Sequence, residues 1–513
     1  MNVTLSVKVK WGKENYPDIE VNTDEDPLVF KAQLFALTGV QPERQKVMLK
    51  GTTLKDSDWG DIKLKDGVTV LMMGSKEEDV PTEPLEKPLF VEDMNEGELA
   101  SALDMPAGLT NLGNTCYMNA TVQCLKTVPE LREALRGFQG GVTMAGGMIP
   151  AQSITAALRD LYDSMDKGAT IPPIILLQVL HMAFPRFAEK SEHGGFTQQD
   201  ANECWTELVR MLQQKLQPKQ TDGSDSQAKF KSLVDQYFGG TFDCELKCIE
   251  AEDEPPSFSK ENFLQLSCFI SQDVRYMLSG LRSKMQEQLT KQSPTLERDA
   301  VYTKTSKISR LPAYLTVQFV RFYYKEKESI NAKILKDVKF PLEFDAFELC
   351  SSKLQQKLTP MRARFKEYED RRVEEAQKQE KEVRNNRDDT SRAKVRHEPF
   401  SFEDDLGSNN SGYYTLQAVL THRGRSSSSG HYVAWVRQKG DIWLKCDDDQ
   451  VSPVTCEEVL KLSGGGDWHC AYVLLYGPRI LEVAENENTK PTAIEETAAP
   501  SPMDTSSSTS PQQ

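Results

Sequence analysis

Hydrophobic and polar residues alternate near the start of the chain in a way that predicts a small, separate domain. Thr4–Trp11 alternates with the period of a β-strand, and Ile19–Asn22 forms a shorter strand that can pair with it. Pro27–Thr38 carries apolar residues at helical spacing, and Lys46–Gly51 and Val68–Met73 return as strands. A hairpin, a helix and returning strands in this order predict a β-grasp domain.

Farther along the chain, a helical half is followed by a half rich in strands. Ala151–Leu180 and Asp200–Leu216 carry apolar residues at helical periods. The later segments Gly240–Cys248, Tyr314–Phe322 and Tyr413–Thr421 alternate or run apolar, as strands do. Together these patterns predict an α+β domain of the papain-like kind.

Three polar stretches set the expected domain boundaries. Residues 76–99 are rich in proline and acidic residues, which is typical of a flexible linker, and separate a domain at 1–75 from one at 100–480. Residues 353–396 mix Lys, Arg and Glu, which indicates a charged, helical insertion. Residues 481–513 have the composition of a disordered tail.

Cys116 is the strongest candidate for chemistry because it follows an Asn/Gly turn at the start of a predicted helix. Asn114 and Thr115 are placed to cap the free amides of that helix. The positive end of the helix dipole favours thiolate over thiol. Asn111 lies five residues upstream, where its amide can face an oxyanion that forms beside the sulfur. The alternative is a buried structural cysteine behind an ordinary capped turn.

A thiol nucleophile needs a base, and His431 is the best candidate. It stands where a Ser/Gly-rich loop enters a predicted strand, and Trp443–Asp449 forms a second short strand that ends in three carboxylates. A turn at Gln438–Asp441 would bring Asp447 beside His431, where it can orient the imidazole. Taken singly, a histidine at a strand edge or an aspartate after a strand is more often structural.

These segments resemble the motifs of the ubiquitin-specific proteases, and they occur in the order found in that family. Gly108–Cys116 resembles the Cys box, and Gln198–Glu203 resembles an intermediate box. Gly430–Val433, Trp443–Asp448 and Ala471–Tyr476 resemble the His box and its continuation. The N-terminal pattern resembles ubiquitin itself. The resemblance implies a ubiquitin-like domain followed by a catalytic domain with thumb, palm and fingers.

The resemblance also implies a reaction, which is hydrolysis of the bond after the C-terminal glycine of ubiquitin. Cys116 would attack the carbonyl, His431 would take and return the proton, and Asp447 would orient His431. Asn111 would stabilise the oxyanion, and Asp448 would assist by holding water or Asn111. The intermediate would be a thioester that water hydrolyses, with no cofactor.

The intermediate box is expected to line the channel for the tail of ubiquitin. Gln199 would bond the main chain of the tail, Asp200 would pair with an arginine or a backbone amide, and Tyr432 would pack on the same tail. The alternative for Asp200 is capping of the following helix, with Glu203 completing a capping box. Both roles can hold together.

The ubiquitin-like domain is expected to dock on the regulatory particle of the 26S proteasome, as such modules do in the family. Val47, Leu49 and Leu71 were candidates for an exposed apolar docking face. The alternative is a domain that only packs against the catalytic core. Two other functions stay open, namely a non-catalytic ubiquitin receptor or scaffold on the proteasome and a general papain-like peptidase.

Cysteine spacing argues against the zinc site that many family members carry in the fingers. Cys244 and Cys248 are followed by only Cys268, so four ligands at the usual spacing are missing. We therefore expect no structural metal. A cysteine-rich site that includes Cys350 is the alternative.

The loop before His431 suggests regulation. Arg423 and Arg425 precede Ser428 in a pattern that basophilic kinases recognise. A phosphate on Ser428 would repel the carboxylates of Asp447–Asp449 or rearrange the loop. The alternative is an ordinary solvated loop.

Composition and charge favour an intracellular protein. The formal net charge of −15 argues against a general nucleic-acid binder, and the ten cysteines form no disulfide ladder. The first residues lack the apolar core of a signal peptide, and no apolar run is long enough to insert in a membrane. We expect a cytoplasmic location, with the nucleus as a second compartment.

Overall fold

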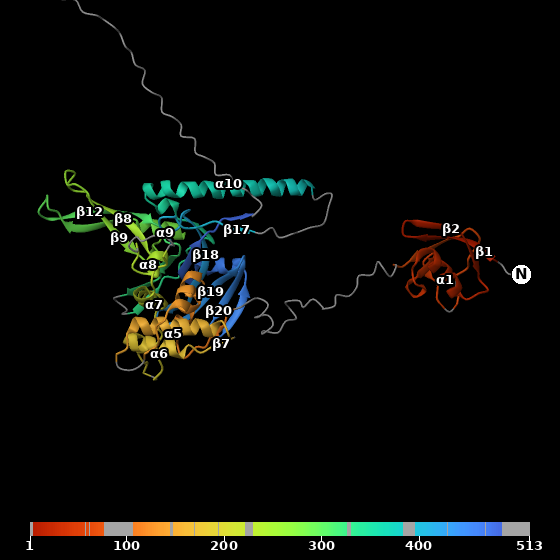
Figure 1. Ribbon diagram of the computed structural model, residues 1–513, viewed down its shortest axis with the longest axis horizontal. Coiled ribbons are helices and arrows are strands. Elements are labelled where there is room, and N and C mark those ends of the chain that lie inside the picture. The colour runs from red at the N-terminus through yellow and green to blue at the C-terminus, as the bar shows by residue number, and fades with distance from the viewer. Residues whose placement is uncertain are drawn as a thin grey trace, which may run out of the picture. The chain divides into compact units, whose positions relative to one another are not determined.

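The computed structural model places two compact units along the chain, one before and one after residue 95 (Figure 1). Each unit is described by itself. The described residues are 4–56, 58–60, 62–75, 106–143, 147–168, 170–192, 194–220, 229–325, 330–382, 395–427, 429–466 and 468–484. Within them, no helix combines the length and the apolar character that a membrane-spanning segment requires.

The N-terminal unit is a mixed five-stranded sheet with one long helix, which confirms the predicted β-grasp fold. Its sheet order is β2-β1-β5-β3-β4, with β1 and β5 parallel and the other pairs antiparallel. Its elements are β1 (Thr4–Trp11), β2 (Glu14–Asn22), α1 (Pro27–Thr38), η1 (Pro42–Arg44), β3 (Lys46–Leu49), β4 (Thr52–Thr53) and β5 (Thr69–Met73).

The core of this unit lies between α1 and one face of the sheet. Phe30 and Leu34 of α1 are buried in the same cluster as Val47 and Leu49 of β3. Val47 is only 2% exposed and Leu49 only 9%, so the prediction that they form an outward docking face is wrong. Because side chains alternate along a strand, Met48 between them points to the opposite face.

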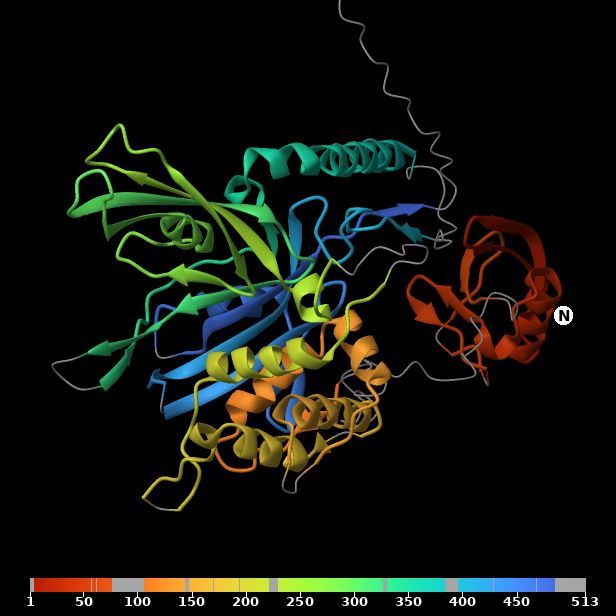
Figure 2. The same cartoon turned by 60° about the vertical axis from the view of Figure 1, so that its left-hand side comes forward.

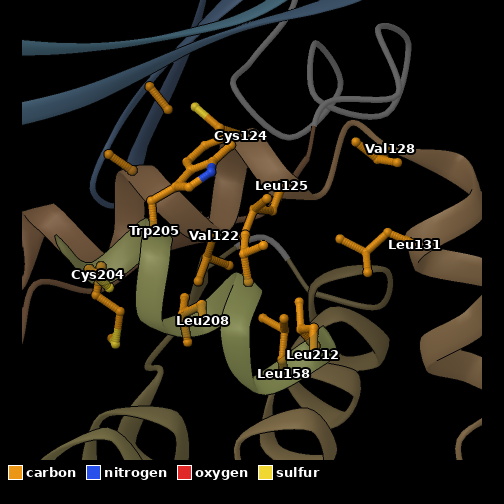
Figure 3. Packing of buried hydrophobic residues seen from close by; sticks show 14 of the residues in the cluster. Val122, Cys124, Leu125, Val128, Leu131, Leu158, Cys204, Trp205, Leu208 and Leu212 are labelled. Atoms are coloured by element: carbon orange, nitrogen blue, oxygen red, sulfur yellow. The ribbon is translucent and has the colours of Figure 1, made fainter. Parts of the chain in front are cut away.

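The first half of the larger unit is helical, as predicted. Its elements are β6 (Gly108–Leu109), α3 (Cys116–Leu125), α4 (Pro129–Gly137), α5 (Pro150–Met165), β7 (Thr170–Ile171), α6 (Ile174–Ala183), η4 (Pro185–Ala188), α7 (Ala201–Lys215) and α8 (Leu233–Tyr237). The expected helix over Ala151–Leu180 is divided into α5 and α6 by Pro172 and Pro173, since proline at these positions interrupts helical hydrogen bonding. Figure 3 shows Val122 of α3 near Trp205 and Leu208 of α7, and Leu158 of α5 near Leu212 of α7.

The second half is built from strands. The largest sheet has the order β10-β13-β22-β18-β19-β20-β21, with β16 paired to β18, and a four-stranded sheet has the order β11-β12-β8-β9. The strands of this second half are β8 (Gly240–Cys248), β9 (Ser257–Phe263), β10 (Leu266–Phe269), β11 (Gln286–Gln292), β12 (Asp299–Arg310), β13 (Leu315–Val320), β14 (Phe322–Lys325), β15 (Ile330–Lys333), β16 (Glu343–Asp345), β17 (Val395–His397), β18 (Tyr413–Ser426), β19 (Ser429–Lys439), β20 (Ile442–Asp447), β21 (Gln450–Val454), β22 (Cys470–Pro478) and β23 (Glu482–Ala484).

Helices also occur in this half, and their placement completes the α+β architecture. They are α9 (Met277–Lys284), η5 (Phe347–Leu349), α10 (Ser352–Glu382), α11 (Cys456–Leu460) and η6 (Lys461–Ser463). Figure 2 shows α3 to α7 gathered on one side of the strands β18 to β20, while the four-stranded sheet extends away from them. The fold therefore brings a helix start and a sheet edge together, which is what the predicted site requires.

Two predicted boundaries are wrong. The tail was expected to be disordered from residue 481, and the charged insertion was expected to continue to 396. Instead β23 pairs antiparallel with β17, and Leu481 and Val483 are buried against Met361 and Phe365 of α10. The reason is that these two apolar side chains cover an apolar stripe on α10. Residues 383–394 and 485–513, like the predicted linker 76–99, lie outside the described residues.

Candidate active site

Cys116 is the first residue of α3, at the helix start that the sequence predicted. The turn before it places Gly113 and Asn114 at positive φ, which bends the chain sharply into the helix. The expected capping by Asn114 and Thr115 is wrong. The Thr115 hydroxyl accepts from Leu112 N at 2.9 Å, and Asn114 Nδ2 donates to Phe196 O at 2.8 Å. Both side chains therefore stabilise the turn and its neighbour.

His431 and Asp447 face each other across the β19–β20 hairpin. The two strands pair antiparallel, and His431 Nε2 lies 2.5 Å from Asp447 Oδ1. The Cys116 thiol lies close enough to the imidazole to raise its pKa, so the structure brings Cys116, His431 and Asp447 together. Because Nε2 is occupied by Asp447, the other ring nitrogen is the one left for the thiol.

The electrostatics of the pair favour a charged imidazole. The hydrogen bond to Asp447 raises the pKa of His431 to about 10, the Cys116 thiol adds to this, and burial opposes it. The same hydrogen bond to His431 lowers the pKa of Asp447 well below its usual range. An imidazolium held beside a thiol stabilises the thiolate, which is the nucleophilic form of cysteine.

Lys445 is a site residue that the sequence analysis missed. Its Nζ lies 2.7 Å from Asp447 Oδ2, so the carboxylate is held by His431 on one oxygen and by Lys445 on the other. Lys445 and Asp447 are two apart on β20 and therefore share a face of the strand. The spacing of two residues between Lys445 and Asp447 was the sequence feature that could have predicted this ion pair.

Asp448 connects the half of the site that holds Cys116 to the half that holds His431. Asn111 Nδ2 donates to Asp448 Oδ2 at 2.8 Å, and Asn119 Nδ2 donates to Asp448 Oδ1 at 2.9 Å. Leu109 N donates to Asp448 O at 2.8 Å. Asp448 thus binds the segments on either side of the thiol through both of its carboxylate oxygens and its backbone carbonyl. Asn119, on α3, is a second residue that the sequence analysis missed.

Close packing leaves no room for a side chain where these two halves meet. A Cβ added to Gly108 would lie 2.3 Å from Asp449 O, far inside van der Waals contact. The backbone of β6 therefore lies directly on the turn after β20. Asp448 itself has a φ of 54°, a conformation that aspartate tolerates better than most residues. The geometry of this turn sets the position of the base relative to the thiol.

Asn111 is fixed rather than free to rotate. Its Oδ1 accepts from Gly113 N at 3.0 Å and Thr115 N at 3.3 Å, while one hydrogen of its amide nitrogen points to Asp448. An NH₂ group carries two hydrogens, so a second one remains for a reacting oxygen. A donor held in this way meets the requirement for preorganised stabilisation of an oxyanion.

Asp200 lies in a very different environment from Asp447. It is the N-cap of α7, accepting from Asn202 N at 2.7 Å and Glu203 N at 3.1 Å, and Tyr472 OH donates to it at 2.8 Å. Burial raises the pKa of Asp200, although these hydrogen bonds partly offset the effect. The cap foreseen for Asp200 is therefore present, but the capping box with Glu203 is not, because the Glu203 carboxylate lies 3.7 Å from Arg186 instead. Tyr472 was not foreseen as its partner, although it lies in a motif that the sequence analysis recognised.

The other proposed substrate residues surround this carboxylate. Gln199 Nε2 donates to Thr197 Oγ1 at 2.8 Å and is partly buried. Tyr432 is 1% exposed, and its ring packs between those of His422 and Tyr472, with centroids 4.7 and 6.3 Å away. In this structure the ring is covered, so packing on a substrate tail stays a prediction that requires its neighbours to move.

The remaining candidates are distributed elsewhere. Ser428 lies outside the described residues. Cys244 and Cys248 are both buried on β8, and Cys268 lies on β10 in a different sheet. Cys350 follows η5. The expectation of no structural metal stays a prediction.

A possible metal-binding group occurs at the catalytic residues themselves. The donor atoms of His431, Asp447 and Asp448 lie within 4.8 Å of one another. These donors already have partners, because Asp447 binds His431 and Lys445, and Asp448 binds two asparagine amides. The arrangement is therefore suited to proton transfer by a thiol and an imidazole.

Comparisons with known proteins agree with this geometry. The pattern of the family described as ubiquitin carboxyl-terminal hydrolase matches residues 107–476, and that of the ubiquitin family matches residues 5–77. The chain is 40% identical to ubiquitin carboxyl-terminal hydrolase 7 of Arabidopsis thaliana, over 93% of this chain and 100% of that protein. It is 42% identical to ubiquitin carboxyl-terminal hydrolase 14 of Caenorhabditis elegans, over 93% of this chain and 94% of that protein.

A third relative has a similar extent. Ubiquitin carboxyl-terminal hydrolase 6 of Schizosaccharomyces pombe is 40% identical, over 92% of this chain and 98% of that protein. The similarity thus includes both units and is not confined to the catalytic motifs. The chain belongs to the ubiquitin carboxyl-terminal hydrolase family, as a cysteine deubiquitinase that acts on ubiquitin and carries an N-terminal ubiquitin-like domain.

Proposed function

We propose that this deubiquitinase works on the proteasome, where it trims ubiquitin from bound substrates by cleaving after the C-terminal glycine of ubiquitin. The observation that carries the chemical part is the hydrogen bond between His431 and Asp447, with the Cys116 thiol beside the same imidazole. The proteasomal part is supported by the ubiquitin-like domain and by the extent of similarity to a hydrolase 14.

In the first half of the proposed reaction, Cys116 attacks the carbonyl carbon of the terminal glycine as a thiolate. The C–S bond forms as electrons move onto the carbonyl oxygen, which Asn111 stabilises through its free amide hydrogen. The tetrahedral species collapses and expels the amine of the substrate. His431 donates the proton that this leaving amine takes up. The product is a thioester between Cys116 and ubiquitin.

In the second half, water attacks the thioester with His431 as general base. Asp447 keeps the imidazole oriented in both steps, and Lys445 positions Asp447. Asp448 acts by holding Asn111 and Asn119, which keeps the oxyanion donor and the helix of Cys116 in place. The proton balance closes because His431 regains from water the proton that it gave to the amine.

The region around Asp200 is proposed to receive the tail of ubiquitin. Gln199 would bond the main chain of the tail, and Asp200 would contribute negative charge toward its arginine residues. Tyr472 supports this role because it already holds the carboxylate of Asp200 in a fixed orientation. Ser428 is proposed to be a regulatory phosphorylation site in the loop before His431.

The outer face of the sheet in the ubiquitin-like domain suits a docking role. Met48 and Leu71 are paired neighbours on β3 and β5, and Lys10 is opposite Leu71 on β1. Lys10 is exposed and the two apolar residues are partly exposed. A small apolar centre with a basic rim is suited to an acidic partner surface with an apolar patch. We propose this face as the contact to the proteasome, and the cytoplasm and nucleus as the places of action.

The decisive experiment is hydrolysis of a fluorogenic ubiquitin C-terminal amide by the purified chain. It is run with and without proteasomes whose own deubiquitinases have been inactivated, with Cys116→Ala as the control. Turnover that needs Cys116 and rises with proteasomes supports the proposal. Turnover that proteasomes leave unchanged would still agree with a deubiquitinase, but it would contradict the proteasomal role.

Binding must be separated from catalysis. Cys116→Ala is expected to abolish turnover and to retain ubiquitin binding, measured by isothermal titration. No turnover by the wild-type chain in either condition, with ubiquitin binding intact, would instead favour a receptor or scaffold.

A further inference from the structure

Helix α1 of the ubiquitin-like domain has an outer face with the composition of a core. Six of its seven exposed residues are apolar, and Gln33 is the polar one. The exposed apolar residues are Leu28, Val29, Ala32, Phe35, Ala36 and Leu37. We call these six residues the α1 face. A surface helix normally presents charged and polar side chains to water, and a helix that is apolar all round is normally covered.

The large side chains of the α1 face are well exposed. Leu28 is 46% exposed, Phe35 40% and Leu37 50%. The inner side of α1 is occupied by Phe30 and Leu34, which pack on the sheet. The outer apolar residues therefore add nothing to the core of their own domain. They expose on the order of a few hundred Å² of apolar surface, which is the size of a functional patch.

The arrangement of these residues matches a helical partner. At 100° per residue, Ala32 and Ala36 lie along the middle of the face, with Leu28 and Phe35 on one side and Val29 on the other. Leu37 lies beyond Gln33 at the margin of the exposed side, about 180° from Leu28, so it lies outside the stripe that a partner helix would cover. Small residues between larger ones let the backbone of a second helix approach closely and place its side chains between them. From Leu28 to Ala36 the stripe is about 12 Å long, enough for about two turns of a partner helix.

Charge near one end of the face indicates the chemistry of that partner. Asp24, Glu25 and Asp26 immediately precede α1, and all three are exposed. A partner helix with Lys or Arg at one end and an apolar stripe along its length would match both features. A second copy of the chain is disfavoured, because this face is well below the roughly 800 Å² per partner of a standard interface.

We propose that the α1 face binds an amphipathic α-helix of another protein, one with an apolar stripe and a basic end. This contact is distinct from the sheet face that carries Met48 and Leu71, because α1 covers the opposite side of the sheet. The proposal does not depend on proteasome binding. It gives the ubiquitin-like domain two binding faces of different chemistry.

The test uses the full chain and a fluorescent synthetic peptide of roughly 18 residues, about 27 Å of helix. The peptide carries Leu at i, i+3, i+4 and i+7, polar residues elsewhere and three Lys residues at one end. One control peptide has Glu in place of Lys, and another has the same composition with the Leu positions scrambled. Fluorescence anisotropy measures the dissociation constant of each, and sedimentation velocity measures the oligomeric state of the chain.

We expect the striped Lys peptide to bind, and Phe35→Glu to weaken it at least tenfold. Met73→Glu is the matched control, because Met73 is also 50% exposed but extends from the sheet, and it should leave binding unchanged. Asp24→Lys should weaken the Lys peptide a few-fold and leave the Glu peptide no weaker. Thermal unfolding should show that Phe35→Glu folds normally.

Several results would overturn the proposal. These are binding of the scrambled peptide as tight as that of the striped one, an unaltered affinity in Phe35→Glu, or no binding of the striped peptide at all. A dimer of the wild-type chain that Phe35→Glu dissociates would assign the α1 face to a second copy of this chain instead.

Discussion

Asp447 and Asp200 are two carboxylates of one catalytic domain whose surroundings differ in almost every respect. Asp447 is partly exposed, is bonded to His431 and Lys445, and has a pKa well below its usual range. Asp200 is also partly exposed, but it accepts from two amides and a tyrosine hydroxyl, and burial raises its pKa. Charged partners keep one carboxylate ionised, whereas neutral donors hold the other in place. The same residue type thus serves electrostatics in one region and architecture in the other.

Removal of the charge of Asp447 should have the largest effect on activity, and it tests the difference between the two carboxylates directly. Asp447→Asn keeps the shape but cannot stabilise an imidazolium, so kcat should fall by about 10²- to 10⁴-fold. The pKa of His431, now about 10 because of Asp447, should also fall, which moves the alkaline limb of activity to lower pH. Measured pH–rate profiles with the fluorogenic ubiquitin amide check both effects. An unchanged alkaline limb would contradict the pairing.

Asp448 tests whether position matters as much as charge. Asp448→Ala removes the acceptor of Asn111 and Asn119 and leaves the triad itself intact. Loosening one preorganised donor should lower kcat by about 10²-fold, somewhat less than loss of Asp447. Ubiquitin binding should change little. A change confined to KM would show instead that the turn contributes to substrate binding.

Asp200 should behave as a structural carboxylate. Asp200→Ala removes a helix cap and leaves the buried Tyr472 hydroxyl without its acceptor, so the free energy of unfolding should fall by about 2 kcal/mol. Asp200→Asn keeps one acceptor oxygen for the two amides, and its NH₂ group can donate to the Tyr472 hydroxyl, so it should cost less. Denaturant unfolding measures both variants. Equal losses in the two would mean that the charge, rather than the hydrogen bonds, is what matters.

The pH dependence of stability should have opposite signs for the two sites. The pKa of Asp447 is lowered on folding, so its stabilising contribution is present above the unfolded pKa near 3.8 and is lost as pH falls through the folded value. The pKa of Asp200 is raised, so its ionised form opposes folding above that value. Relative to wild type, the deficit of Asp447→Asn should shrink on acidification, whereas any charge-related gain of Asp200→Asn should be largest near neutral pH. Thermal unfolding between pH 3 and 7 checks the signs.

The smallest effect is expected at Lys445. Lys445→Met retains the length of the side chain but removes the second partner of Asp447, so kcat should fall only a few-fold. The effect should weaken at high salt, because a partly exposed ion pair is screened. A loss as large as that of Asp447→Asn would place Lys445 in a more direct role.

The sequence was sufficient to predict that the proposed catalytic residues would lie together, because each lies in a local pattern that constrains its position. Cys116 follows a turn that begins a helix, and His431 and Asp447 lie on strands joined by a short turn. Such local patterns predict which residues meet when the strand register is set by a tight connection. Asn119 was missed because nothing local marks it and its role exists only through its contact with the distant Asp448. Lys445 was missed although its spacing from Asp447 places both side chains on one face of β20.

The wrong predictions share a physical reason, which is that local pattern does not show which face is covered. The alternation at Val47 and Leu49 does not show that α1, the helix adjacent in sequence, covers their side of the sheet. Leu481 and Val483 have too few apolar neighbours in the sequence to predict a strand. Their position is set by packing on α10. The Thr115 hydroxyl was expected on the helix amides, but the tighter turn before it offered a nearer donor.

The hydrogen bonds of Asp448 to Asn111 and Asn119 also affect when the site forms during synthesis and folding. These contacts join residues 337 and 329 positions apart, so they form only after a very long segment of chain has closed into a loop. During synthesis the thiol emerges long before its base exists. A nascent chain therefore carries a cysteine that cannot yet cleave ubiquitin, and competence arises as one of the last events of folding.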